Sequence, residues 1–322
     1  MSVIEAFNAG NWWKLMPGSF ASRLSGGRFT LYPHVKYLYD VVEKAIREGD
    51  GRVIVSMPPR HGKSEACSVY LPAWFLENWP DRNVLFASYE GDFAAGFGRK
   101  VRGLISGNDG LLQTRVDKNS QSSSRWNTQY GGGMVSVGAG GALTGRGGHL
   151  MIVDDPHKDW KEAQSATLRA NVVDWFNATF YTRAEPGATI IVIQTRWHED
   201  DLAGWLLREH TDKWVNVCLP AIAEEGDPLG REIGAALCPS RFPRGVLDRT
   251  SRAMGAYMFA ALFQQRPIPS EGGVFNRDWW QYYEKRPLFW RVVQSWDTAV
   301  SERDTSAWSV GQTWGESEDG FY

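Results

Sequence analysis

The sequence predicts an α/β fold whose mostly parallel sheet is covered by helices on both faces. Apolar, β-branched runs of strand length recur along the chain, helical segments separate several of them, and no internal repeat is visible. Continuous apolar runs are typical of parallel strands that are buried on both faces. The predicted strands are 52–57, 83–88, 133–137, 149–154, 188–195 and 214–219, and the predicted helices are one ending near 79 and those at about 90–105, 161–180 and 200–209.

Composition indicates an ordinary globular protein. A length of 322 residues allows one large domain or two. Hydrophobic residues make up 43% and charged residues 22%, which argues against a disordered chain. The formal net charge is −2, so any contact with nucleic acid must come from local patches of basic side chains.

Neither a membrane span nor a secretory signal is visible in the sequence. No apolar run approaches the ~18 residues that a span needs, and the N-terminus lacks a basic start followed by an apolar core. Cys67, Cys218 and Cys238 are odd in number and far apart, which favours a reducing compartment over a disulfide framework or a metal cluster. We therefore expect a soluble intracellular protein.

The segment MPPRHGKS, residues 57–64, follows a predicted strand and opens a predicted helix. In a P-loop the backbone N–H groups cradle phosphates, the Lys reaches the terminal phosphates and the Ser hydroxyl binds Mg²⁺. Met57 stands where the usual pattern has its first Gly, so a strict pattern search misses this loop. We predict a P-loop NTPase that binds ATP with Mg²⁺ through Pro59, Arg60, His61, Gly62, Lys63 and Ser64.

Three side chains near this loop have a functional and a simpler interpretation. Arg60 can reach the γ-phosphate as a catalytic cation, or it can face solvent. Tyr32 and His34 lie about thirty residues upstream, where they can stack on or hydrogen-bond the adenine base. Ordinary aromatic packing explains Tyr32 and His34 equally well.

Two acids, Asp154 and Asp155, end the predicted strand 149–154. Open α/β sheets bind ligands at the carboxyl ends of their strands. Asp154 is therefore predicted to hold Mg²⁺ together with Ser64, and Asp155 to orient and deprotonate the attacking water. The alternative is a turn of the Asp-Asp-Pro type that merely ends the strand.

Two further segments carry candidate residues. The stretch 131–148 holds nine glycines in eighteen residues, which is typical either of a flexible loop or of a loop that closely approaches a ligand or a neighbouring subunit. Arg146 in this stretch is a candidate arginine finger acting on a neighbouring subunit, or else a plain loop arginine. Gln194 and Thr195 end the next strand, where they can sense the γ-phosphate and couple hydrolysis to the rest of the protein.

A change of composition at 264–273 (QQRPIPSEGG) predicts a linker. Beyond it, apolar segments at 291–296 and 307–311 indicate a strand pair that begins a new unit. We accordingly divide the chain into a P-loop domain at 1–265, a linker at 266–288 and a second unit at 289–322.

Four motifs occur in a fixed order along the chain: MPPRHGKSE, GRGGHLMIVDDP, IVIQTRWHEDDLAG and MFAALFQQRPIPSEGGVF. Together they resemble the large terminase subunit of tailed double-stranded DNA bacteriophages or prophages. The resemblance implies an ATP-driven motor that packages double-stranded DNA into a procapsid as a homo-oligomeric ring at the portal protein, with a small terminase subunit as partner. It further implies a site of action in the host bacterial cytoplasm, with no membrane contact.

The resemblance also assigns roles to single residues. Many family members carry Glu as the catalytic base where Asp155 stands, and Asp is one methylene shorter, so the water must lie closer or be reached indirectly. The other assignments are the phosphate loop with Arg60, Lys63 and Ser64, the metal carboxylate Asp154, the arginine finger Arg146 acting in trans, and the coupling motif Gln194 and Thr195.

A C-terminal nuclease with an RNase H-like fold, which cuts concatemeric DNA, is implied as well. Asp297 matches its first metal-binding acid, and Asp304 is a neighbour on the same hairpin. Hydrolysis with two Mg²⁺ or Mn²⁺ ions needs several carboxylates. Only 25 residues follow Asp297, so we expect a truncated nuclease and a chain that hydrolyses ATP without cleaving DNA.

Two other functions remain open at this point. A superfamily 2-like DNA helicase or translocase shares the phosphate loop, the metal acids and the coupling strand, but normally carries a second motor domain after about residue 250. An inactive prophage remnant that merely binds DNA is the other alternative. An ATPase assay distinguishes this remnant from a motor.

Overall fold

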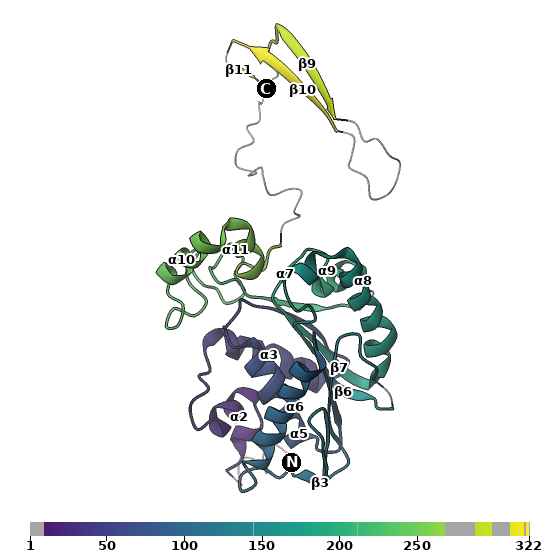
Figure 1. The fold of residues 1–322 in the computed structure, drawn as a ribbon. Coiled ribbons are helices and arrows are strands. Elements are labelled where there is room, and N and C mark those ends of the chain that lie inside the picture. Colours follow the sequence, from purple (N-terminus) through teal and green to yellow (C-terminus); the bar gives the residue numbers. More distant parts are fainter. Residues whose placement is uncertain are drawn as a thin grey trace. The chain divides into compact units, whose positions relative to one another are not determined.

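The chain consists of two compact units. The computed structural model describes residues 10–143, 145–210, 212–267, 287–297, 310–318 and 320–321. The first unit spans Met1–Glu271 and the second spans Gly272–Tyr322. In Figure 1 the first unit is coloured from purple to green, and the strands of the second unit are yellow-green to yellow.

An eight-stranded sheet forms the centre of the first unit, in the order β3-β4-β5-β2-β6-β7-β1-β8. The six strands from β5 to β8 in this order are parallel, whereas β3 and β4 pair antiparallel at one edge. The strands are β1 (Arg52–Ser56), β2 (Asn83–Ser88), β3 (Val116–Gln121), β4 (Arg125–Thr128), β5 (Gly133–Gly138), β6 (Gly148–Asp154), β7 (Ala184–Gln194) and β8 (Val215–Cys218).

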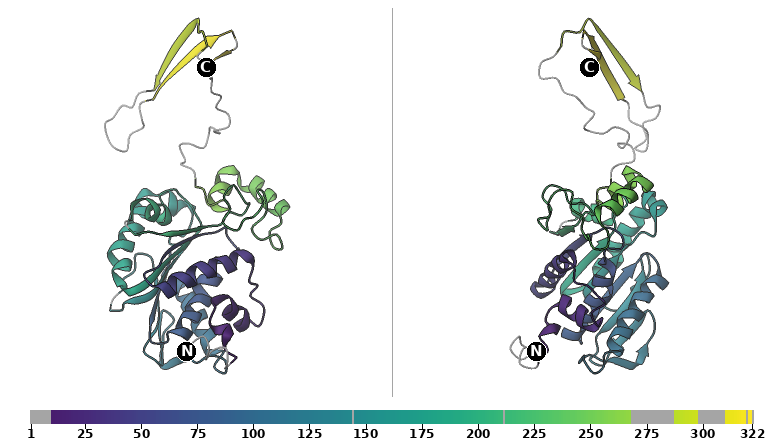
Figure 2. Two further views of the ribbon diagram at one scale, coloured as in Figure 1. Left: turned by 180° about the vertical axis from the view of Figure 1, so that it is seen from behind. Right: turned by 90° about the vertical axis from the view of Figure 1, so that its left-hand side faces the viewer.

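Helices cover both faces of this sheet (Figure 2). Successive strand side chains point to opposite faces, so Val53 and Val55 pack with α2, α3, α5 and α6, whereas Ile54 packs with α8, η3 and α9. The helical segments are η1 (Trp12–Lys14), α2 (Pro17–Leu24), α3 (Pro33–Glu48), α4 (Lys63–Glu65), η2 (Ala66–Tyr70), α5 (Leu71–Asn78), α6 (Gly91–Ser106), α7 (Trp160–Gln164), α8 (Ala166–Trp175), η3 (Phe176–Phe180), η4 (Tyr181–Arg183), α9 (Leu202–Glu209), α10 (Arg244–Met254) and α11 (Ala256–Leu262).

The helix that follows β1 is continuous from α4 through η2 to α5, and η2 is a π-helical turn. Pro72 has no backbone N–H to donate to the carbonyl of Ser68, and its ring crowds that carbonyl. The wider π turn accommodates this, and such turns are frequent at functional sites. Ser68 is consequently buried in the widened turn, facing the sheet.

After β8 the chain builds a small lobe with an apolar core of its own. Ile222 and Ala236 form an antiparallel bridge, and Ala236 packs with Leu247 of α10 and Phe259 of α11. This lobe begins beside β1, because the backbone N–H of Leu219 donates to the carbonyl of Ser56 over 2.9 Å.

The described part of the second unit is a three-stranded antiparallel sheet. It consists of β9 (Arg291–Asp297), β10 (Val310–Ser317) and β11 (Gly320–Phe321), in the order β11-β10-β9. Asp297 lies opposite Val310 in the ladder.

The predicted α/β class is confirmed, and each of the six predicted strands of the first unit is present within a few residues of its expected bounds. The predicted helix 161–180 is wrong in one respect. It is interrupted at Ser165, whose side chain accepts a hydrogen bond from the N–H of Leu168 and so caps a new helix. Within the described part of the chain, no helix combines the length and the apolar character of a membrane span.

Candidate nucleotide-binding site

The carboxyl ends of three neighbouring parallel strands, β6, β7 and β1, meet at one edge of the sheet. Ser56 lies opposite Gln194, and Asp154 lies opposite Ile193. The loop after β1, the two acids after β6 and the polar end of β7 therefore converge. The structure thus brings together residues that the sequence separates by more than 130 positions.

Backbone conformation explains how the loop 57–64 departs from the usual pattern. The positions with positive φ are Arg60 at 65° and Gly62 at 92°, so no glycine is required where Met57 stands. The Met57 side chain is fully buried in the core. A positive φ is uncommon for a residue such as Arg60, and strain of this kind is concentrated at functional sites.

Lys63 is the centre of the polar contacts at this edge. Its Nζ donates to Thr195 Oγ1 over 2.8 Å and lies 3.1 Å from Asp155 Oδ2. The other carboxylate oxygen, Asp155 Oδ1, accepts from the backbone N–H of Thr195 over 2.8 Å. Lys63, Asp155 and Thr195 thus form a closed set of contacts that joins the loop to β6 and β7.

Asp154 is fully buried, with its two carboxylate oxygens in different surroundings. Asp154 Oδ2 accepts from Ser68 Oγ over 2.7 Å, whereas Oδ1 is buried without a partner among the described residues. Burial raises the pKa of this carboxyl, the charge of Asp155 raises it further, and Lys63 lowers it, together with the hydroxyls of Ser68 and Ser64.

This donor set fits a magnesium ion. Mg²⁺ prefers hard oxygen ligands, and it commonly binds through one or two protein oxygens together with substrate phosphates. The unpartnered Asp154 Oδ1 and the nearby Ser64 hydroxyl are oxygen atoms of this kind.

Asp155 has a φ of 45°, which is unusual for a residue other than glycine. Its N–H donates to the carbonyl of Ile193 over 2.8 Å, which ties the strained residue to β7. The Asp155 side chain is 31% exposed, in contrast to the buried Asp154. One acid thus faces the protein interior, and the other faces the space above the loop.

Gln194 is buried, and neither its amide nitrogen nor its amide oxygen has a hydrogen-bond partner among the described residues. Leaving buried polar atoms unpaired is costly. This side chain is therefore placed to gain partners from a ligand or from a rearranged loop.

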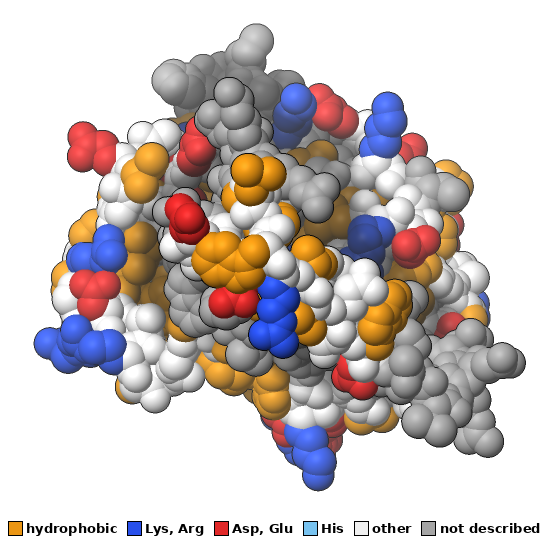
Figure 3. Space-filling view, turned by 90° about the horizontal axis from the view of Figure 1, so that it is seen from above, with side chains coloured by type: hydrophobic (Ala, Val, Ile, Leu, Met, Phe, Trp, Pro, Cys, Tyr) orange, Lys and Arg blue, Asp and Glu red, His pale blue; other side chains and the backbone are white. Residues whose placement is uncertain are grey.

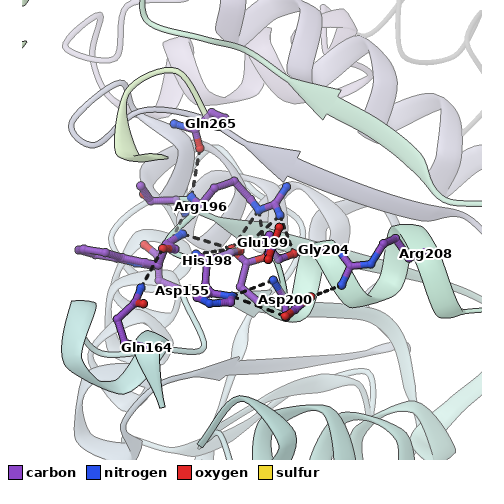
Figure 4. Close-up of polar contacts among 12 residues, drawn as sticks. Asp155, Gln164, Arg196, His198, Glu199, Asp200, Gly204, Arg208 and Gln265 are labelled. Atoms are coloured by element: carbon purple, nitrogen blue, oxygen red, sulfur yellow. Dashed lines mark hydrogen bonds and ion pairs between the residues drawn. The ribbon is translucent and has the colours of Figure 1, made fainter. Parts of the chain in front are cut away.

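A network that sequence reasoning did not identify follows β7 (Figure 4). Arg196 Nε contacts both oxygens of Asp201 at 2.9 Å, and Asp201 also caps α9 by accepting from Gly204 N–H. The backbone N–H of Arg196 donates to Gln265 Oε1 over 3.2 Å. The signal was present in the motif IVIQTRWHEDDLAG, but the partner Gln265 is distant in sequence.

Arg146 does not lie at this edge. It precedes β6, at the opposite end of the strand from Asp154, and β6 is about 20 Å long at ~3.3 Å per residue. Arg146 and Arg125 help to line a pocket of about 230 Å³. Arg146 Nη1 is buried without a partner among the described residues, and burial lowers the pKa of this guanidinium. Arg146 is thus far from the P-loop of its own chain.

Tyr32 and His34 pack against each other below the loop. Their rings are stacked with centroids 5.6 Å apart, and His34 Nε2 lies 3.0 Å from the carbonyl oxygen of His61. His34 is completely buried, and burial lowers its pKa. His34 thus packs against Tyr32 and the phosphate loop, and the contact of Tyr32 and His34 with adenine stays a prediction.

The acids predicted for a nuclease belong to the second unit in sequence. Asp297 ends β9 in the second unit, with an exposed side chain, and Asp304 lies outside the described residues. Among the residues that the structure describes, no group of three or more His, Cys, Asp or Glu could hold a metal ion. The role of Asp297 and Asp304 stays a prediction.

Comparison with known proteins identifies proteins that are similar to this chain. A family model described as terminase large subunit, T4likevirus-type, N-terminal, matches residues 54–281. The crystal structure of the large terminase of bacteriophage HK97 matches with a TM-score of 0.53 and 15% identity, covering 96% of this chain and 67% of that one. The large terminase from a thermophilic bacteriophage, in complex with ADP, matches with a TM-score of 0.42 and 13% identity, covering 86% and 62%.

A comparison with curated protein sequences found no match. The chain spans about two thirds of the HK97 terminase and 62% of the terminase from the thermophilic phage. At these identities the HK97 likeness bears on the fold, and it agrees with the mixed α/β architecture described above.

Proposed function

The chain belongs to the terminase large subunit family, and from this premise we propose that it hydrolyses ATP to move double-stranded DNA into a procapsid. The observation that carries the proposal is the set of contacts among Lys63, Asp155 and Thr195, with the buried Asp154 beside them. A phosphate-binding lysine, a metal carboxylate, a second acid and a polar strand end in one place are the parts that phosphoryl transfer needs.

In this proposal the backbone N–H groups of the loop and the Lys63 ammonium bind the phosphates of ATP. Ser64 and Asp154 would hold Mg²⁺, which neutralises charge that develops on the β- and γ-phosphate oxygens. Lys63 must then exchange its contacts with Asp155 and Thr195 for phosphate oxygens. This exchange frees the Asp155 carboxylate to orient and deprotonate the attacking water.

Arginines would complete the charge stabilisation. Arg60 is an exposed residue of the loop with a positive φ, and from there its long side chain would reach the γ-phosphate. Arg146 lies about 20 Å from the acids of its own chain, by the length of β6, so we assign it to the nucleotide of a neighbouring subunit. An oligomeric ring supplies such a neighbour.

Release of the γ-phosphate would be transmitted through β7. Thr195 contacts Lys63 directly, so it responds to what Lys63 binds. The buried amide of the adjacent Gln194 has no hydrogen-bond partner among the described residues and can form new hydrogen bonds when Thr195 moves. Arg196 then connects β7 to Asp201 at the start of α9 and to Gln265 after α11. We propose this path for coupling hydrolysis to movement.

Family membership also supports the partners that we propose: double-stranded DNA, a portal protein, a small terminase subunit and further copies of this chain in a ring, in the cytoplasm of the bacterial host. In Figure 3 acidic and basic side chains of the described residues both appear, and neither kind gathers into one large patch. Asp297 and Asp304 are proposed as metal ligands of a nuclease. Because this chain is expected not to cleave DNA, plasmid cleavage by wild type with Mg²⁺ or Mn²⁺ would contradict that expectation, and loss of such cleavage in Asp297→Asn would then support Asp297 as a metal ligand.

An ATPase assay tests the motor. Wild type is compared with Lys63→Ala and Asp154→Ala, with DNA, portal and small subunit supplied. We expect wild type to hydrolyse ATP and each variant to do so at a rate lower by about 10²-fold or more. A wild type no faster than its variants would favour the inactive remnant and end the motor proposal. The superfamily 2-like helicase is disfavoured by the family match.

A further inference from the structure

The order of the strands places the candidate catalytic residues and the segment after β8 on opposite sides of β1. The acids and the polar strand end that would act on the γ-phosphate, Asp154, Asp155 and Thr195, follow β6 and β7. In the sheet β7 lies on one side of β1, and β8 lies on the other. A nucleotide with its γ-phosphate toward β7 therefore directs its base and ribose toward the segment that follows β8.

That segment returns to the phosphate loop after leaving the sheet. Leu219 is hydrogen-bonded to Ser56 at the end of β1, and Leu237 N–H donates to the carbonyl of Ala221 over 2.8 Å. The next residues form a turn in which Phe242 N–H donates to the carbonyl of Cys238 over 2.8 Å. The turn 238–242 is thus fixed by backbone hydrogen bonds beside the loop.

Phe242 attaches this turn to the phosphate loop itself. Its ring stacks on the ring of His61, with centroids 4.5 Å apart and an interplanar angle of 25°. His61 is 2% exposed, and its Nδ1 lies 2.9 Å from the carbonyl oxygen of Pro59. The position of Phe242 is therefore defined by a rigid part of the loop.

Arg241 lies over the ring of Phe242. Its guanidinium carbon is 5.4 Å from the centroid of the Phe242 ring, and its side chain is exposed. Its positive charge lowers the pKa of both His34 and His61, although less than burial does, which places it close to the loop. No carboxylate among the described residues forms an ion pair with Arg241, in contrast to Arg231, which is paired with Asp227.

We propose that Arg241, supported by Phe242, binds the base and ribose of the nucleotide held by the phosphate loop. A planar guanidinium stacks on an aromatic base and donates hydrogen bonds to ribose hydroxyls, and an ammonium cannot do both. A purine offers the larger stacking surface, so the ligand class is a purine ribonucleotide. The inference rests on the proposed ATPase function, to which it adds the contact with the nucleoside.

The experiment compares a nucleotide with its phosphate chain alone. Affinities of the full chain for Mg·ATP, Mg·ADP and inorganic tripolyphosphate are measured by calorimetry. The variants are Arg241→Ala, Arg241→Lys and Phe242→Leu, with Lys63→Ala as the reference for the phosphate end. Arg252→Ala, an exposed arginine in the last turn of α10, is the matched control for loss of a surface charge.

We expect Arg241→Ala to weaken the binding of ATP and ADP about tenfold. The affinity for tripolyphosphate should stay within about twofold of the wild-type value. Arg241→Lys should recover little, because the ammonium lacks the planar surface, and Phe242→Leu should give a smaller loss of the same selectivity. Lys63→Ala should weaken the binding of all three ligands, and Arg252→Ala should weaken the binding of none.

Two results overturn the inference. Unchanged ATP affinity in Arg241→Ala shows that this residue does not touch the nucleotide, and equal losses of ATP and tripolyphosphate show that it acts on phosphates or on the shape of the loop. If wild type itself binds neither ATP nor tripolyphosphate, the proposed function fails, and the inference fails with it. If wild type binds ATP and Arg241→Ala binds it equally well, the inference fails, but the proposed function stands.

Discussion

Lys63 and Asp155 form an ion pair at the edge of the sheet, with Lys63 Nζ 3.1 Å from Asp155 Oδ2. Thr195 completes the contact, because its hydroxyl accepts from Lys63 and its N–H donates to Asp155. The proposed catalytic acid is thus held by the same lysine that would bind phosphate. Binding of a nucleotide must compete with this pair before hydrolysis can occur.

Replacing Asp155 separates these two effects. We expect Asp155→Asn to lower kcat by about 10²–10⁴-fold, the usual contribution of general acid–base catalysis. Its affinity for ATP should rise, because Lys63 no longer has to leave a carboxylate. Steady-state ATPase kinetics and calorimetry with ATP measure the two quantities. A weaker affinity would mean that Asp155 supports the loop rather than competing with phosphate.

Ser68 should control how well Asp154 holds magnesium. The Ser68 hydroxyl donates to Asp154 Oδ2 over 2.7 Å, and both side chains are fully buried. Ser68→Ala leaves a charged oxygen without its donor, which costs about 1–3 kcal/mol. We expect the Mg²⁺ concentration for half-maximal ATPase activity to rise several-fold. Ser106→Ala, at the exposed end of α6, should leave the Mg²⁺ requirement unchanged.

Two neighbouring aspartates should differ sharply in their effect on stability. Asp201 is fully buried and accepts from Arg196 and from the N–H groups of Trp197 and Gly204. Asp201→Ala removes the carboxylate partner of the Arg196 guanidinium and leaves it only its contacts with backbone carbonyls among the described residues. We expect a loss of about 3–5 kcal/mol in the free energy of unfolding.

Asp200, which pairs with Arg208 on the surface, is the control. Asp200→Ala should cost about 1 kcal/mol or less, because exposed ion pairs contribute little. Urea denaturation of both variants measures the difference. Equal losses would contradict a structural role for the Arg196–Asp201 pair.

The buried His61 predicts a pH dependence of stability. Burial lowers its pKa from 6.5 to about 4, so the folded protein keeps this ring neutral while the unfolded chain protonates it. The contribution of the neutral His61 ring to the free energy of unfolding is complete above pH 6.5. It is lost as the pH falls toward about 4, which lowers the free energy of unfolding by up to about 3 kcal/mol. His61→Phe keeps an aromatic ring against Phe242 and removes the titration. Its unfolding free energy should fall less steeply than that of wild type between pH 6.5 and 4.

Sequence reasoning predicted the central strands and the P-loop for a common reason. Long apolar runs that end in polar residues, such as the strand that ends at Asp154, keep their meaning in any α/β sheet. The edge strand β3 (VDKNSQ) carries almost no apolar residue, so no pattern identified it. The helix α3 was not predicted, although Pro33 at its start and Gly49 after its end are signals of helix ends.

The contacts of the site were less predictable than its members. The positive φ of Arg60 and Asp155 depends on tertiary packing, which no local pattern encodes. Ser68 reaches Asp154 only because a π turn rotates it toward the sheet. Phe242 and Gln265 meet the site from segments more than 170 residues downstream of the P-loop. Contacts of this kind follow from the fold and not from spacing.

The distance between Arg146 and its own P-loop gives a prediction for mixed rings. If Arg146 acts on the nucleotide of a neighbouring subunit, Arg146→Ala and Lys63→Ala should each be inactive alone. A mixture of the two variants should regain activity, because some interfaces then combine an intact loop with an intact arginine. In a random one-to-one mixture, about a quarter of all interfaces combine an intact loop with an intact arginine, which sets the upper bound on the recovered activity. ATPase rates of the assembled mixture, measured across mixing ratios, should peak near equal amounts. A mixture as inactive as its components, or an Arg146→Ala variant that is active alone, would show that Arg146 serves another purpose, such as binding an anion in the pocket that it shares with Arg125.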